Sequence, residues 1–175
     1  MKWRGACHPA SVLLCVLFRE MGLNAVPCTG IVANYSGCFS HSWVEVDSRV
    51  YDATIWLQER IEVQASPVMA SIHLDTGEET ALLYGIDFLP LEPDASNFTN
   101  HSFARLMNCA VEAAYAQPGV IVWDILFSIA KRLKLPLPGL GKAGFSTFEL
   151  REKYKELKFV HVKRYSEEQV YSTFA

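Results

Sequence analysis

The sequence contains no Cys-x-x-Cys pair and no apolar stretch that reads as a membrane span. Its five cysteines are an odd number, whereas a disulfide framework uses an even, patterned set. We therefore expect a reducing compartment and a cytoplasmic protein. The apolar run at residues 12–18 is far too short to cross a bilayer, which needs about 20 residues.

This apolar run does imitate part of a secretory signal peptide, because two basic residues precede it. A small-residue cleavage site is missing, and Arg19-Glu20 follows the run directly. The secretory interpretation stays as the minority alternative. It would remove Cys7, on which the main hypothesis depends.

The chain also lacks a strong excess of either charge and has no internal repeat. Its formal net charge is −3 over 175 residues, with 50% hydrophobic and 20% charged residues. Such a composition can bury a core. It gives no electrostatic reason to expect nucleic acid or an anionic membrane as a partner. The length suits one domain, or one domain with an extension.

An amphipathic helix is predicted over residues 9–21, and Cys7 lies just before it or at its start. Apolar residues recur there at the i, i+3, i+4, i+7 spacing. Pro9 suits the first turn, where its missing N–H costs nothing, and Gly22 suits the position after the end. A helix N-terminus favours a thiolate over a thiol. On position alone, a half-buried structural cysteine is the better interpretation.

The rest of the chain divides into a strand-rich part and a helix-rich part. Alternating or β-branched segments predict strands at residues 24–33, 41–46, 49–55, 61–63, 81–84 and 159–163. Prolines and polar residues between 90 and 100 mark a boundary or a long loop. Helical periodicity predicts helices at residues 102–116, 120–133 and 146–157.

Two of these strands form a hairpin that brings a histidine and an aspartate together. With Asp47-Ser48 as a two-residue turn, His41 and Asp52 become diagonal neighbours on one face, roughly 7 Å apart at the backbone. A carboxylate there would orient the imidazole and stabilise its protonated form. A register shift of one residue would separate them, so this inference depends on the turn. Each residue alone is more often structural, and the combination with Cys7 favours a catalytic site.

Three segments resemble the transglutaminase-like superfamily, in that family's order. Gly5-Ala6-Cys7, with a helix that closes over residues 18–25, resembles its nucleophile segment. Residues 41–46 resemble its H-A-W-V-E-V strand, and residues 51–54 resemble the D-P-T strand that follows. An alanine replaces the proline that is common in the last motif, and residues after 100 carry no motif that we recognise.

The resemblance implies an α+β, papain-like fold in which a nucleophile helix packs on an antiparallel sheet. We expect a catalytic core over residues 1–95 and a mostly helical C-terminal extension over residues 96–175, packed together as one compact domain. Cys7 would be the nucleophile, His41 its base and Asp52 the residue that orients the base. The family includes transglutaminases, proteases, peptide N-glycanases and enzymes that process ribosomal peptides.

The expected reaction is acyl transfer on amide bonds of a peptide or protein, through a thioacyl enzyme. Hydrolysis is the leading expectation, followed by transamidation or deamidation. The Cys7 backbone N–H is the first oxyanion donor. The indoles of Trp3 and Trp43 are candidates for a second donor or a substrate contact, although a packed aromatic side chain is the favoured role. We expect no cofactor and no metal. The possibility that a partner chain completes the substrate groove stays open.

Two other functions remain as alternatives. Arg4-Gly5-Ala6-Cys7 resembles the R-G-G-x-C motif of arylamine N-acetyltransferases, which would acetylate an arylamine from acetyl-CoA. A non-catalytic binding module on the same fold would have an unreactive Cys7 and a partner whose binding survives Cys7→Ala.

A zinc site is the remaining alternative. Its ligands would be Cys28, Cys38 and His41, with Cys7 or His8 as the fourth. Their spacing lacks the paired form of common zinc sites, so this interpretation is the weaker one.

Overall fold

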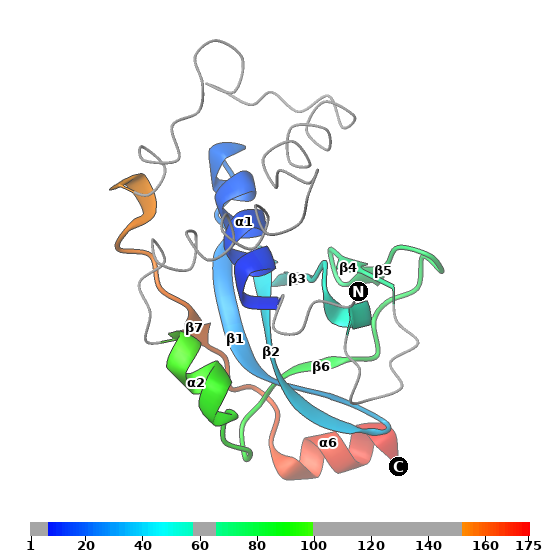
Figure 1. Cartoon of the computed structure of the whole chain (residues 1–175). Helices are drawn as coiled ribbons and strands as arrows, with labels where there is room; N and C mark the ends of the chain where they lie inside the picture. The colour runs from blue at the N-terminus through cyan, green and yellow to red at the C-terminus, as the bar shows by residue number, and fades with distance from the viewer. Residues whose placement is uncertain (1–6, 58–65, 100–151) are drawn as a thin grey trace.

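The computed structural model describes residues 7–57, 66–99 and 152–175 (Figure 1). Its elements are α1 (Cys7–Glu20), β1 (Val26–Asn34), β2 (Gly37–Val46), β3 (Arg49–Tyr51), the 3-10 helix η1 (Ile55–Leu57), β4 (Val68–Met69), β5 (Ile72–His73), β6 (Leu83–Ile86), α2 (Pro93–Thr99), β7 (Val160–His161) and α6 (Glu167–Phe174). The predicted α+β class and the C-terminal helical element are confirmed. The helices predicted at 102–116 and 120–133, most of the one at 146–157, and the strand at 61–63 lie outside the described residues.

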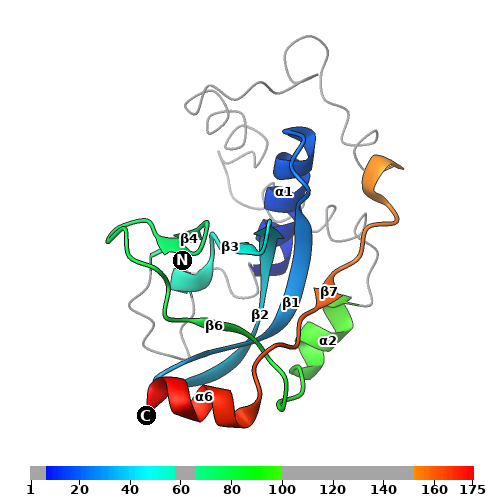
Figure 2. The ribbon, with the colours of Figure 1, turned by 180° about the vertical axis from the view of Figure 1, so that it is seen from behind.

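The main sheet has the strand order β3-β2-β1-β6, and β7 pairs with β1 as well. All of its pairs are antiparallel except that between β1 and β7, which is parallel. Helix α1 lies along β1 and β2, and α6 lies near the far end of their hairpin (Figure 1). Figure 2 shows β7 beside β1. The sheet therefore includes a strand from the predicted extension. No helix in the described ranges is long and apolar enough to cross a membrane.

Helix α1 begins at Cys7 and ends before Gly22. Its apolar face packs into a core cluster whose buried members are Val12, Cys15, Val16, Ala25, Val44, Val46 and Tyr154. Gly22 has φ +83°, the left-handed conformation that suits the residue after a helix. Packing of this face fixes the rotation of α1 on the sheet. Cys7 is consequently held at the first position of the helix, beside the strands.

The β2–β3 hairpin has the predicted turn. Asp47 and Ser48 have φ values of 50° and 63°, and Val46 pairs with Arg49 across them. Two consecutive positive φ angles define a turn whose twist matches that of the strands it joins. Because the register follows from the turn, His41 and the residue after β3 share one face of the sheet.

Two predicted segments differ from the structure. The strand predicted over 49–55 ends at Tyr51, because the backbone of Asp52 turns away and exchanges hydrogen bonds of 2.7 and 2.9 Å with Val68. The loop predicted around residues 93–99 is the short helix α2, with Pro93 at its first position, where a proline costs no hydrogen bond.

The C-terminal segment packs directly on the middle of the sheet. A Cβ atom on Gly30 would lie 2.9 Å from the Val162 carbonyl oxygen and 3.0 Å from Trp43. A Cβ atom on Gly85 would lie 2.7 Å from Val162 Cγ1, and Gly85 has φ +98°. These two glycines therefore allow the segment around β7 to approach the sheet closely. The cluster behind the site includes Trp43, Tyr84 and Val162.

Candidate active site

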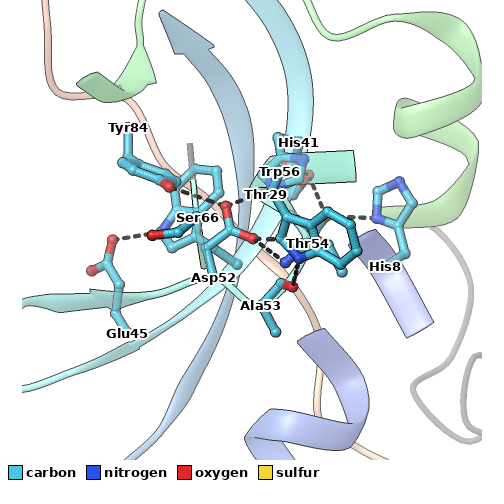
Figure 3. Close-up of polar contacts among 12 residues, drawn as sticks. His8, Thr29, His41, Glu45, Asp52, Ala53, Thr54, Trp56, Ser66 and Tyr84 are labelled. Carbon is cyan, nitrogen blue, oxygen red and sulfur yellow. Dashed lines mark hydrogen bonds and ion pairs between the residues drawn. The ribbon is translucent and has the colours of Figure 1, made fainter. Parts of the chain in front are cut away.

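Cys7, His41 and Asp52 meet in the structure. His41 Nε2 lies 2.7 Å from Asp52 Oδ2. Figure 3 shows these two side chains in contact. The Cys7 side chain is hydrogen-bonded to His41. Since Asp52 occupies Nε2, the ring nitrogen left for the thiol is Nδ1. His41 is 0% and Asp52 1% exposed, while Cys7 retains 8%. All three residues are therefore buried in the structure.

The charge of Asp52 controls the ionisation of His41. Burial alone would lower the pKa of His41, but the charge and hydrogen bond of Asp52, together with Cys7, raise it above its usual value. The site consequently favours an imidazolium ring. This is the form that a neighbouring thiolate would need as its counter-ion.

Asp52 accepts hydrogen bonds on both of its carboxylate oxygens. The backbone N–H and the hydroxyl of Thr54 donate to Oδ1 over 3.0 and 3.2 Å. His41 and the Tyr84 hydroxyl share Oδ2, the latter at 3.0 Å. Four donors hold the carboxylate in one orientation, which is what a residue that orients a histidine requires. Sequence reasoning missed Tyr84, because β6 carries no motif that links it to this hairpin.

A second set of polar contacts joins the start of α1 to the strands. His8 Nδ1 lies 2.6 Å from Ser42 Oγ, which donates to Thr29 Oγ1 at 3.2 Å. The Thr29 hydroxyl donates to the His41 carbonyl at 3.0 Å. Because each hydroxyl has one hydrogen, His8 Nδ1 is assigned as the donor to Ser42. Burial and the charge of His41 lower the pKa of His8 to about 4, so the His8 ring is neutral at pH 7. The contacts tie the helix that carries Cys7 to the strand that carries His41.

The two tryptophans proposed as oxyanion donors have different outcomes. Trp3 lies outside the described residues. Trp43 is fully buried, its indole N–H donates to Glu45 Oε1 at 2.9 Å, and Arg164 binds the other Glu45 oxygen at 2.6 Å. Trp43 therefore has no N–H to offer an oxyanion, and that suggested role is wrong. It is a packed aromatic side chain, in edge contact with Tyr84.

The cysteines and histidines suggested for zinc do not assemble. Within residues 7–57, 66–99 and 152–175, no group of three or more His, Cys, Asp or Glu side chains could hold a metal ion. Cys28 is buried, which raises its pKa well above the ordinary value, and Cys38 is exposed. The set of Cys28, Cys38 and His41 is thus not a metal site in the described structure.

The fold and the site together define a class of protein. It is an α+β protein in which a cysteine at a helix N-terminus contacts a histidine–aspartate pair on a neighbouring hairpin. Within that class, residues 1–63 match the family model of the transglutaminase-like superfamily. The match confirms the resemblance over that segment and supports a place among cysteine-based acyl-transfer enzymes and proteases. No curated protein and no solved structure gives a significant match.

Proposed function

We propose that the chain is a cysteine acyl-transfer enzyme that hydrolyses amide bonds of a peptide or protein. Cys7 is the nucleophile, His41 the base and Asp52 the orienting carboxylate. The observation that carries the proposal is the continuous hydrogen bonding from the Cys7 side chain through His41 to Asp52. This arrangement is the one in which an imidazole can take a thiol proton.

The reaction follows from the positions of these atoms. His41 Nδ1 takes the Cys7 proton, and the sulfur attacks the amide carbonyl carbon. The resulting oxyanion accepts a hydrogen bond from the Cys7 backbone N–H, at the start of α1, where the helix dipole also favours negative charge. His41 then protonates the leaving amine, and a thioester remains on Cys7. Water, deprotonated by His41, releases the acid and restores the thiol. An amine in place of water gives transamidation.

Free thiols support an intracellular, reducing setting for this chemistry. Cys7, Cys15, Cys28 and Cys38 are all unpaired by disulfides. We propose a peptide or protein as the substrate, with no nucleic acid and no membrane as partner. We also propose that the C-terminal extension, residues 96–175, contributes to substrate specificity.

A peptide-library screen tests the activity. The full chain is incubated with the library, with and without a primary amine, and the products are identified by mass spectrometry. Hydrolysis predicts new carboxyl ends that disappear in Cys7→Ala, and amine-dependent mass shifts would indicate transamidation. Products that are unchanged in Cys7→Ala would contradict the proposal. Tight peptide binding without any product would favour the non-catalytic binding module instead.

A further inference from the structure

We propose that Tyr84 is a positioning residue of this site, which acts through Asp52 to set how tightly His41 holds its proton. The inference rests on the proposed function for its catalytic meaning. It rests on geometry alone for the coupling between the three side chains.

The geometry consists of two donors on one oxygen. The Tyr84 hydroxyl lies 3.0 Å and His41 Nε2 lies 2.7 Å from Asp52 Oδ2. Figure 3 shows the Asp52 carboxylate between the two rings. Tyr84 is only 3% exposed, so water does not readily replace its hydroxyl on the carboxylate. Whatever changes the Tyr84 donor must therefore change the charge that His41 experiences.

The ring of Tyr84 is held firmly in this position. Its centroid lies 5.1 Å from that of Trp43, at an interplanar angle of 65°. Gly85, the next residue in β6, accepts backbone hydrogen bonds from both Arg164 and Tyr165. Burial and the charge of Asp52 raise the pKa of Tyr84, so the hydroxyl remains a donor throughout the working range of pH.

A donor on a carboxylate disperses its negative charge. Among the described residues, removal of the Tyr84 hydroxyl leaves Oδ2 with His41 as its remaining side-chain donor. The attraction between the carboxylate and the imidazolium then grows. The His41 ring then holds its proton more tightly. It becomes a poorer acid toward the leaving amine, so turnover falls while substrate binding is little changed.

The test measures the ionisation of His41 directly, by NMR of its ring nitrogens in the full chain. Tyr84→Phe is expected to raise the titration midpoint of His41 and to move the Nε2 proton further downfield. Tyr154→Phe is the matched control, because Tyr154 is also buried and also donates its hydroxyl to a carboxylate, that of Glu20. This control should lose stability without any shift in the His41 signals.

A second variant keeps the test decisive if Tyr84→Phe fails to fold. Site-specific 3-fluorotyrosine at position 84 retains the ring shape and makes the hydroxyl a stronger donor, so the His41 midpoint should move down. Unchanged His41 signals in either folded variant would overturn the inference. These signals report ionisation and not turnover. A shift without any acyl transfer would therefore refute the proposed function alone, and turnover with unshifted signals would refute the role of Tyr84 alone.

Discussion

His41 and Asp52 are a buried ion pair, and their stability depends on both partners being present. Neither side chain is more than 1% exposed, so neither can recover hydration if the other is removed. A buried charge without its partner is strongly destabilising, whereas an exposed pair contributes little. The pair therefore links the catalytic hypothesis to the stability of the fold.

Asp52→Asn should lower the free energy of unfolding by about 3 kcal/mol at pH 6. The pKa of His41 is raised in the folded state, so the pair stabilises the fold fully below the usual histidine pKa. This contribution is lost as the pH rises through the folded-state pKa of His41, and the difference from the wild type should shrink. Urea unfolding of the wild type and of Asp52→Asn between pH 6 and pH 10 measures this difference in stability. Asp87→Asn, at an exposed ion pair, should change little, and a pH-independent deficit for Asp52→Asn would contradict this account.

The contact between His41 and Asp52 was predictable because it depends on the local geometry of one hairpin, whereas the contact of Cys7 with His41 was expected from the family resemblance. A helix start places Cys7, and one turn sets the register of the strand that carries His41. Tyr84 was not predictable, since it approaches from a strand 32 residues beyond Asp52. The His8 contact was missed for a similar reason. Its partner Ser42 lies 34 residues away on another element.

At the scale of elements, the β2–β3 turn determines which side chains share a face. Both turn residues have positive φ, although neither is glycine, and a left-handed non-glycine residue costs roughly 1–2 kcal/mol. The pairing of β2 with β3 across the turn has to offset this cost. Long helices and strands with clear periodicity were predicted here, whereas β4 and β5, with two residues each, are too short to show alternation.

Replacement of Asp47-Ser48 by Asn-Gly should stabilise the fold by about 1 kcal/mol, because both residues tolerate positive φ. The site should be unaffected. Insertion of one glycine after Ser48 should instead move Asp52 to the other face and abolish any reactivity that depends on His41. Thermal unfolding and thiol labelling measure the two effects. An insertion variant that folds and keeps full reactivity would show that the register does not control the site.

At the scale of the whole molecule, the last described segment completes the sheet behind the site. Backbone hydrogen bonds join Val162 to Thr29 in β1 and Arg164 to Gly85 in β6. These hydrogen bonds join residues that are far apart in the sequence, so no local pattern predicted them. The parallel pairing of β7 with β1 also could not be inferred from a two-residue strand.

Gly85→Ala should destabilise the fold by about 3 kcal/mol, because it adds a steric clash to an unfavourable φ. Gly77→Ala is the matched control. Gly77 also has positive φ, at +74°, but a Cβ there meets nothing within 4 Å. It should cost only about 1 kcal/mol. If Gly85→Ala and Gly77→Ala lost equal stability in urea unfolding, the close packing of Val162 against Gly85 would contribute nothing to the cost of the Gly85 substitution.

The rate at which iodoacetamide labels each cysteine at pH 6, located by peptide mapping, tests the central claim most directly. An ordinary thiol, with a pKa of about 8.5, is almost fully protonated at pH 6, whereas a thiolate paired with an imidazolium still reacts. The account predicts fast labelling at Cys7, lost in a folded His41→Gln variant, and slow labelling at exposed Cys38, whose pKa is raised by partial burial. Cys7 that reacts no faster than Cys38, or equally fast without His41, would contradict it.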